Sequence, residues 1–196
     1  GATVAELFDG RVFLAGNPDI PNTVFYSALS MSEDRDALYF GAENYFNDGI
    51  GRYPTVSMLA VHDSIAIFKS GDDGSGSIFY HTPKETGDDY VPKIYPVSYA
   101  HSGIRVYGRA CSFFDDPLFV SDEGVCALTQ KAINLERSVA CRSHNVNFDL
   151  LKEDLECITL TRWCGYLAAC GRGRIYLADS RSTFVHESGN AEYEWF

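Results

Sequence analysis

The chain has 196 residues, of which 45% are hydrophobic and 14% aromatic, and its formal net charge is −11. This length suits a single globular domain, and the aromatic content favours strands. An acidic surface repels phosphate, which argues against nucleic-acid binding as the main role. No apolar run approaches the roughly 20 residues of a membrane-spanning helix. We therefore expect neither nucleic acid nor a membrane as a partner.

The first residues and the cysteines indicate the kind of cellular compartment in which the protein is made. Gly1-Ala2-Thr3 lacks the basic stretch and the apolar core of a secretion signal. No CxxC pair and no zinc-like Cys/His spacing occurs, and several cysteines lie within apolar runs, where Cys is a small filler. We expect free thiols made in a reducing compartment, and a disulfide between Cys164 and Cys170 stays open as an alternative. The six cysteines are Cys111, Cys126, Cys141, Cys157, Cys164 and Cys170.

A repeated pattern of tight turns organises the chain, and Val56–His81 shows it most clearly. Each turn separates two apolar, strand-forming runs, and successive turns are spaced by roughly 50 residues, as in propeller-type repeats. The turns are Asp9-Gly10, His62-Asp63, Asp115-Asp116 and Cys164-Gly165.

After each turn the second apolar run is followed by a polar or glycine-containing loop, a third strand and a weaker fourth strand. The predicted fourth strands are Ala37–Phe40, Lys93–Val97, Ala132–Leu135 and Thr183–His186. The unit is therefore an antiparallel four-stranded meander. We predict one domain over residues 1–196, with repeats at about 3–42, 55–98, 109–136 and 157–187.

The strands do not alternate between apolar and polar residues. Ile65–Phe68 and Val125–Leu128 are apolar on both faces, whereas a sandwich strand with one wet face alternates. Propeller blades stack face to face, so both of their faces are covered. We therefore predict an all-β fold, a β-propeller of about four four-stranded antiparallel blades.

One short helix is predicted between the third and fourth repeats. Asn147–Leu155 has apolar residues at i, i+3 and i+7, and Asn145 or Asn147 is a candidate cap. A weaker helical turn is predicted around Leu135–Cys141. At the end of the chain, Tyr193–Phe196 alternates and reads as the start of another strand. We therefore expect a fragment of a longer propeller protein.

The segment from Gly10 to Leu29, GRVFLAGNPDIPNTVFYSAL, is similar to one in virion structural proteins of tailed bacteriophages and prophages of Gram-positive bacteria. The likeness covers nearly the whole chain. It continues through Ile67-Phe68-Lys69, Pro117–Ser121 with Gly124, Leu135-Glu136-Arg137, Arg142-Ser143, Leu151-Lys152-Glu153 and Ile175–Arg181. Members are described as stabilisation, head–tail or tail proteins, and they are poor in cysteine, from which this chain departs.

The resemblance implies a scaffold with no catalytic residues. Its implied partners are other virion proteins and further copies of itself, and its implied location is the bacterial host cytoplasm during assembly and then the virion. On this basis we expect a non-catalytic structural protein of a phage or prophage virion, a head–tail connector or tail component. Catalytic, cofactor-binding and metal-ligating residues are expected to be none, and the binding residues are unknown.

Individual motifs favour structural roles. Gly16–Asp19 is typical of a β-turn, Asp72–Ser77 lacks the calcium-loop spacing, and Gly171–Gly173 joins two strands. No G-x-S-x-G nucleophile elbow occurs. The histidines show no paired ligand spacing, and His62 is expected to lie exposed in a turn. The five histidines are His62, His81, His101, His144 and His186.

The alternative function is a carbohydrate-binding or degenerate glycosidase-like propeller. It would need a shallow pocket with aromatic platforms and paired carboxylates. Only Trp163 and Trp195 are present, and Trp163, at the end of a predicted inner strand, is expected in the core. The candidate carboxylates are Glu33, Asp34, Asp36, Asp88, Asp89, Asp115, Asp116, Asp122 and Glu123.

Overall fold

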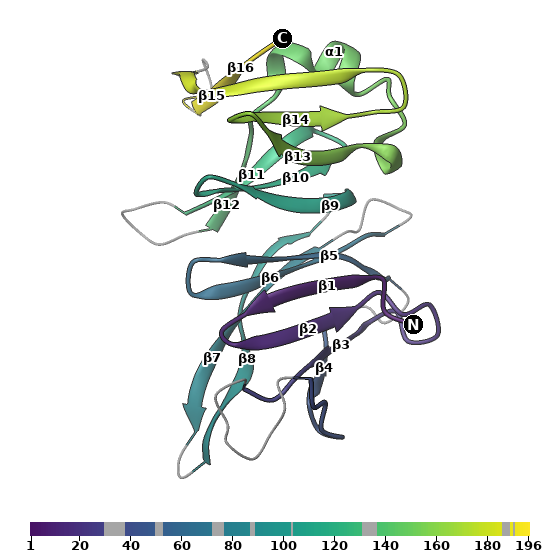
Figure 1. The fold of residues 1–196 in the computed structure, drawn as a ribbon, viewed down its shortest axis with the longest axis vertical. Coiled ribbons are helices and arrows are strands. Elements are labelled where there is room, and N and C mark those ends of the chain that lie inside the picture. Colours follow the sequence, from purple (N-terminus) through teal and green to yellow (C-terminus); the bar gives the residue numbers. More distant parts are fainter. Residues whose placement is uncertain are drawn as a thin grey trace. The chain divides into compact units, whose positions relative to one another are not determined.

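The computed structural model describes residues 1–29, 38–49, 53–71, 77–86, 89–102, 104–130, 137–185, 189 and 191–196. It is all-β, with four four-stranded antiparallel sheets and one short α-helix in the described part (Figure 1). This confirms the predicted class and the predicted repeat unit. The chain forms two compact units, Gly1–Arg105 and Val106–Phe196. The expectation of one domain over 1–196 stays a prediction.

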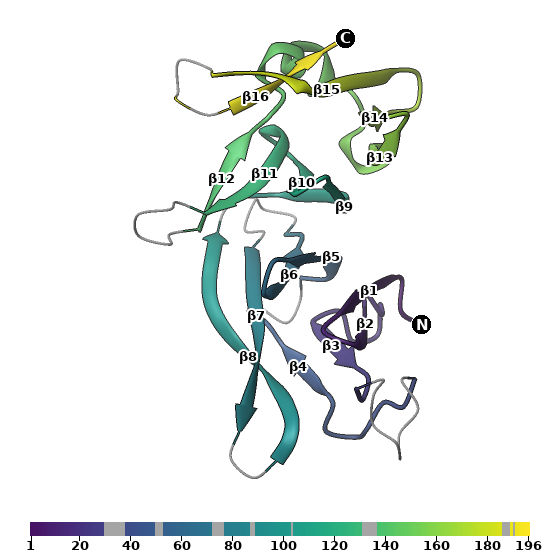
Figure 2. The same ribbon diagram turned by 60° about the vertical axis from the view of Figure 1, so that its left-hand side comes forward.

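The first unit holds two meanders, named sheet 1 and sheet 2. Sheet 1 consists of β1 (Val4–Phe8), β2 (Arg11–Ala15), β3 (Thr23–Tyr26) and β4 (Tyr45–Asn47), which pair in that order. Sheet 2 consists of β5 (Thr55–Val61), β6 (Ser64–Lys69), β7 (Ser77–Thr86) and β8 (Asp89–Ser102), again in chain order. Figure 2 shows β1, β2 and β3 side by side.

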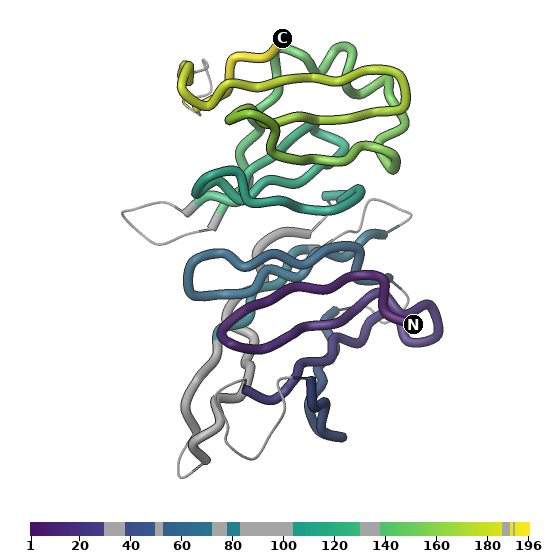
Figure 3. Tube along the Cα trace, viewed as in Figure 1, coloured from purple at the N-terminus to yellow at the C-terminus, as the bar shows by residue number. Residues whose placement is uncertain are grey.

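The second unit holds sheets 3 and 4. Sheet 3 consists of β9 (Val106–Phe113), β10 (Asp116–Ser121), β11 (Gly124–Gln130) and β12 (Arg137–Cys141). Sheet 4 consists of β13 (Thr159–Trp163), β14 (Tyr166–Cys170), β15 (Ile175–Val185) and β16 (Ala191–Trp195). The tube in Figure 3 follows these meanders along the chain.

The first hairpin turn has the same backbone geometry in all four sheets. Its first residue has a positive φ in each case, and these four are the only non-glycine residues with positive φ in the described part: Asp9 (φ 48°), His62 (φ 53°), Phe114 (φ 52°) and Cys164 (φ 49°). Two-residue hairpin loops need such angles because their twist then matches that of the strands. The predicted turns are confirmed. The third lies one residue earlier than predicted, at Phe114-Asp115.

The fourth strands were the weakest part of the sequence prediction. Lys93–Val97 lies within β8, as predicted. The prediction at Ala37–Phe40 is wrong, because its described residues 38–40 form no strand and β4 follows at Tyr45. The prediction at Thr183–His186 is also wrong: the described residues 183–185 continue β15 past a register shift, and β16 is the fourth strand. Ala132–Leu135 lies outside the described residues.

The helix is shorter than predicted. α1 covers only Asn147–Leu150, flanked by 3-10 turns at His144–Val146 and Leu155–Cys157. Of its apolar residues only Leu150 is buried, since Phe148 and Leu151 are exposed, so the stripe does not face the core. Neither predicted cap is used: Val146 holds the N-cap position, and no side chain caps the helix.

One further sequence expectation on local structure is wrong. The helical turn expected around Leu135–Cys141 is the strand β12 over its described residues. The segment Tyr193–Phe196 was expected to begin another strand, and a strand is present there. Its residues 193–195 belong to β16, which pairs with β15 and completes sheet 4.

Within each unit the two sheets stack face to face, and their first strands contact each other: β1 with β5, and β9 with β13. The core of the first unit joins Phe8 and Phe13 of sheet 1 to Ile65 and Ile67 of sheet 2. The residues between them, Ala66 and its neighbours on β6, are buried as well, so both faces of this strand are covered. This agrees with the apolar pattern in the sequence.

The turn geometry leads to a stability prediction for Cys164→Asn. Asn tolerates positive φ better than Cys, and Asn-Gly is the preferred pair for a two-residue hairpin turn. We expect this exposed substitution to raise the free energy of unfolding by about 0.5–1 kcal/mol. Urea denaturation measures it. Thr159→Asn, on an exposed strand position of β13, is the control and should be destabilising. Equal effects of both substitutions would contradict the prediction.

Candidate interaction site on the fourth sheet

The shared turn provides a common frame for comparing the sheets. The residue just before the positive-φ position is Phe8 in sheet 1 and Phe113 in sheet 3. Both are buried, with exposed fractions of 8% and 1%, and both belong to the core between their sheet and the next. Phe113 meets Tyr193 of sheet 4 edge-on, with ring centroids 5.9 Å apart. This position therefore packs against the following sheet.

Trp163 occupies the same position in sheet 4, and its exposed fraction is 56%. The prediction that Trp163 lies in the core is therefore wrong. Its strand has the expected orientation, since Leu160 of β13 points into the core shared with sheet 3. Trp163 lies on the opposite face, which no following sheet of the described chain covers.

The second strand of sheet 4 repeats this arrangement. Four and six residues after the positive-φ residue, β2 has Phe13 and Ala15, which are buried against sheet 2. The corresponding residues of β14 are Ala168 and Cys170, which lie on the same face as Trp163. Their neighbours Leu167 and Ala169 face sheet 3. The face of β13 and β14 that carries Trp163, Ala168 and Cys170 thus corresponds to the face that is buried in sheets 1 and 3.

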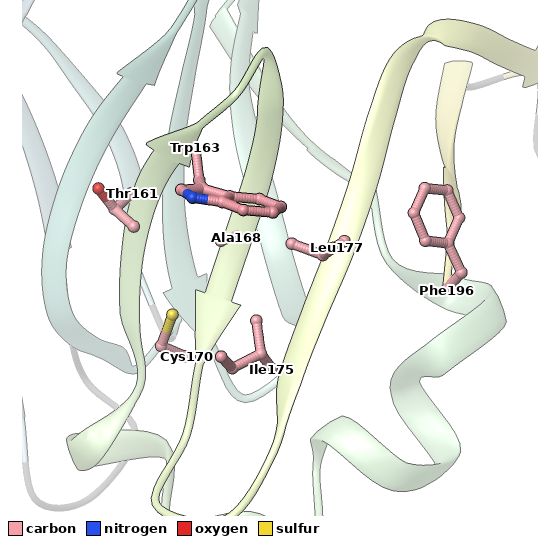
Figure 4. Close-up of a pocket in the computed structure, with 7 residues that line it drawn as sticks. All are labelled: Thr161, Trp163, Ala168, Cys170, Ile175, Leu177 and Phe196. Carbon is pink, nitrogen blue, oxygen red and sulfur yellow. The ribbon is translucent and has the colours of Figure 1, made fainter.

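This face forms an apolar groove of about 520 Å³ (Figure 4). Figure 4 shows the Trp163 ring lying across β14, with Leu177 and Ile175 on β15 beside it. Phe196 comes from the end of β16, where its backbone pairs with Leu177 through two hydrogen bonds of 2.8 and 2.9 Å. The residues that line the groove are Thr161, Trp163, Ala168, Cys170, Ile175, Leu177 and Phe196.

A polar network between sheets 3 and 4 holds sheet 4 in place on the side opposite the groove. The Arg142 guanidinium donates to both carboxylate oxygens of Asp116, at 2.8 and 3.3 Å, and to the backbone carbonyl of Ala191 at 2.8 Å. The Trp195 indole donates to the Arg142 carbonyl at 2.7 Å, and the Tyr193 hydroxyl donates to Asp116. These bonds hold β16, and hence one wall of the groove, against sheet 3.

Sheet 1 presents the opposite kind of face. Leu7 lies two residues before the positive-φ residue of sheet 1. The residues at the same position are Ala60 in sheet 2 and Arg162 in sheet 4, and both face the preceding sheet. Nothing precedes sheet 1 in the described chain, and Leu7 has an exposed fraction of 68%. Phe25 and Tyr45 extend this apolar face, with ring centroids 6.2 Å apart.

A buried polar cluster in the first unit was not foreseen. His81 Nε2 contacts Asp48 Oδ2 at 2.7 Å, and its ring stacks on Phe46 with centroids 4.1 Å apart. The Lys69 ammonium donates to the Asn22 side-chain oxygen and to the Asp48 carbonyl. Burial lowers the pKa of Lys69 to about 8, although the nearby Asp48 charge opposes the shift. No spacing in the sequence signals this cluster, because His81 lies on sheet 2 and Asp48 follows the last strand of sheet 1.

The other sequence candidates lie apart from the groove. His62 is exposed in its turn, as predicted, and His144 contacts Glu192 at 2.5 Å. The side chains of His101 and His186 lie outside the described residues, as do residues 72–76 of the Asp72–Ser77 loop. In the described part, no three His, Cys, Asp or Glu side chains lie close enough together to hold a metal ion.

The carboxylates do not assemble into a pair at the groove. Asp116 is held by Arg142, and none of the lining residues carries a carboxylate. Asp115, Asp122 and Glu123 lie on turns of sheet 3. The remaining candidates fall on residues whose side chains lie outside the described part: Glu33, Asp34, Asp36, Asp88 and Asp89.

Two predicted turns are confirmed. At Gly16–Asp19 the Asp19 amide donates to the Asn17 side-chain oxygen at 3.1 Å, and Gly16 has φ +74°. At Gly171–Gly173 the Gly171 amide donates to the Arg174 carbonyl at 2.9 Å, closing the loop between β14 and β15.

Comparison with models of known protein families gives no match, and no curated protein matches the chain. In the part of the chain that the structure describes, no helix has the length and apolar character needed to cross a membrane. Function must therefore be argued from the groove itself.

The comparison of equivalent positions predicts that two aromatic truncations lower the free energy of unfolding by different amounts. Phe113→Ala removes a buried ring and should lower the free energy of unfolding by about 3–5 kcal/mol. Trp163→Ala removes a ring that is more than half exposed and should cost about 1 kcal/mol or less in the dilute protein. Urea denaturation at low protein concentration measures both. A cost for Trp163→Ala equal to that for Phe113→Ala would mean that Trp163 is covered.

The buried Lys69 predicts a pH-dependent stability. Its folded pKa of about 8 lies below the ordinary lysine pKa of 10.5, so between these two pH values the unfolded chain binds more protons and stability rises with pH. The stability of Lys69→Met relative to the unmodified chain should therefore fall by about 2 kcal/mol from pH 8 to pH 10. Denaturant unfolding at each pH measures it. Lys152→Met, at an exposed site, should show no such trend.

Proposed function

We propose that the chain is a non-catalytic structural and assembly protein whose four sheets are blades of a propeller-like stack. Trp163 carries this proposal, because it is an exposed aromatic residue at a position where sheets 1 and 3 bury a Phe against the next sheet. The groove is therefore a blade face that lacks a neighbour. A phage or prophage virion, in a head–tail or tail position, is the setting that the resemblance of the sequence suggests.

The groove suits the outer face of sheet 1 of a second copy. Leu7, Val12 and Leu14 occupy the positions that sheet 2 fills with Ala60, Ile65 and Ile67, the residues that pack against sheet 1. Sheet 4 of one copy against sheet 1 of the next would thus repeat the contact already formed inside each unit. Such a contact joins two different surfaces, so it builds rings or longer stacks.

The charge of the chain supports an apolar contact. Each copy carries a formal net charge of −11, so two copies repel each other at long range. Association therefore has to come from burial of apolar surface, and added salt should strengthen it by screening the repulsion.

Carbohydrate binding is the second candidate function, because the exposed Trp163 ring is the kind of platform on which sugars stack. The lining argues against it, since it is almost entirely apolar and contains no carboxylate to receive sugar hydroxyls. A glycan array that gives hits abolished by Trp163→Ala would favour this alternative over the scaffold role.

The scaffold proposal predicts a specific pattern of association. The unmodified chain should form multimers as its concentration rises, whereas Trp163→Asp and Leu7→Asp should each be monomeric, because each places a charge in one half of the contact. An equimolar mixture of the two variants should form 1:1 dimers and nothing larger, since one intact groove and one intact sheet 1 face remain. Sedimentation velocity and light scattering measure these states.

Val185→Asp is the matched control, because Val185 is apolar and exposed but lies outside the groove. It should associate like the unmodified chain. A chain that stays monomeric at high concentration, or variants that do not restore each other, would overturn the proposed contact. The virion setting has its own test: mass spectrometry of purified particles from the host should detect the chain, and its absence would remove that part of the proposal.

A further inference from the structure

Two of the six cysteines lie directly opposite each other on neighbouring strands. Cys126 of β11 pairs with Cys141 of β12 in the antiparallel register of sheet 3. Both side chains lie on the face away from sheet 4, since Val125 and Ala127 point into the core shared with that sheet. Both thiols are free, and both residues are buried.

The backbone hydrogen bonds show whether Cys126 and Cys141 form a hydrogen-bonded or a non-hydrogen-bonded pair. The Arg142 amide donates to the Val125 carbonyl at 2.8 Å, so the bond lies just beyond the two cysteines rather than between them. Cys126 and Cys141 are therefore a non-hydrogen-bonded pair, in which the Cα atoms are about 4.5 Å apart and the side chains approach most closely. This separation lies within the range that a disulfide spans.

The surroundings favour a thiolate on one of the two sulfurs. The Asn147 amide donates to Cys141 Sγ at 3.6 Å, and Ser143 Oγ lies 3.8 Å from the same sulfur. The hydrogen bond from the Cys126 thiol lowers the pKa of the Cys141 thiol, burial opposes this shift, and the Ser143 contacts lower the pKa further. Cys126 Sγ has Ser121 Oγ at 3.3 Å as a further partner. Cys141 is thus the nucleophile of the pair, and Cys126 is the resolving thiol.

The remaining cysteines offer no comparable geometry. Cys164 lies in the turn of the β13–β14 hairpin, whereas Cys170 pairs with Thr159 at the far end of the same hairpin. The register therefore rules out the disulfide that the sequence left open, because about five residues of extended strand, roughly 17 Å, separate the two. Cys111 lies opposite Leu118.

We propose that Cys126 and Cys141 form a site of reversible oxidation that closes as a cross-strand disulfide when the protein meets a peroxide. The Cys141 thiolate attacks one peroxide oxygen, which gives a sulfenic acid and releases hydroxide. The Cys126 sulfur then attacks the sulfenic sulfur and water leaves. In total, two thiols and one hydrogen peroxide give one disulfide and two waters. The bridge ties β11 to β12 at the end of sheet 3 that holds the β10–β11 turn.

Peptide mapping of the intact chain tests this. After hydrogen peroxide treatment and digestion without reductant, the peptides that contain Cys126 and Cys141 should be found joined, with the loss of two hydrogen atoms. Dithiothreitol should separate them. The melting temperature of the oxidised chain should rise by about 6 °C or more, because the bridge closes a loop of roughly 15 residues.

Variants separate the two roles. Cys126→Ser should stop the reaction at the Cys141 sulfenic acid, which dimedone traps, whereas Cys141→Ser should leave Cys126 unmodified by the same peroxide dose. Cys111→Ser is the control and should give the same bridge as the unmodified chain. If the mapped peptides stay separate, or if Cys164 is joined in their place, the proposal is overturned. The mapping needs no variant, so it stands even where a serine substitution impairs folding.

Discussion

A sheet that is apolar on both faces needs a neighbour on each side, and this requirement governs the structure. β6 is buried along its whole length, so sheet 2 cannot be the outer layer of a sandwich. In the first unit sheet 1 covers one face of sheet 2, and in the second unit sheet 3 covers one face of sheet 4. The same requirement is unmet at Leu7 and Trp163, where apolar faces remain in solvent. Those two faces follow from the repeat and need no special explanation.

The repeat itself is set by local geometry. A positive φ at the first residue of each opening hairpin fixes the alternation of both strands, so a residue's distance from that turn decides which face it occupies. The rule holds although the residues concerned, Asp9, His62, Phe114 and Cys164, share no chemistry. Backbone twist is therefore the common feature of the four repeats. The turns could be located from the sequence because each one separates two apolar runs.

The sequence predicted what local pattern controls and missed what depends on neighbours. The opening hairpins and third strands follow from apolar runs broken by turn residues. β16 was misplaced because β15 is long and continues through a register shift that no composition signals. Trp163 was expected in the core because its strand was predicted to be an inner one, and the sequence does not tell whether another sheet covers it. The contact between His81 and Asp48 spans 33 residues, and no spacing reveals it.

Apolar faces alone would leave the stacking of sheets poorly defined, because burial is proportional to area and has no direction. Each unit adds a polar contact that does have direction. In the second unit the Arg142 guanidinium donates two hydrogen bonds to the Asp116 carboxylate and one to the carbonyl of Ala191 on β16. In the first, His81 on sheet 2 meets Asp48 at the end of sheet 1. Sliding one sheet over the other would leave these buried groups unpaired, at a cost of several kcal/mol. The groove on sheet 4 lacks any such polar partner among its lining residues. The second copy that we propose would therefore be held by burial and shape, and the proposed assembly would form and separate without disturbing the contacts that fix each unit.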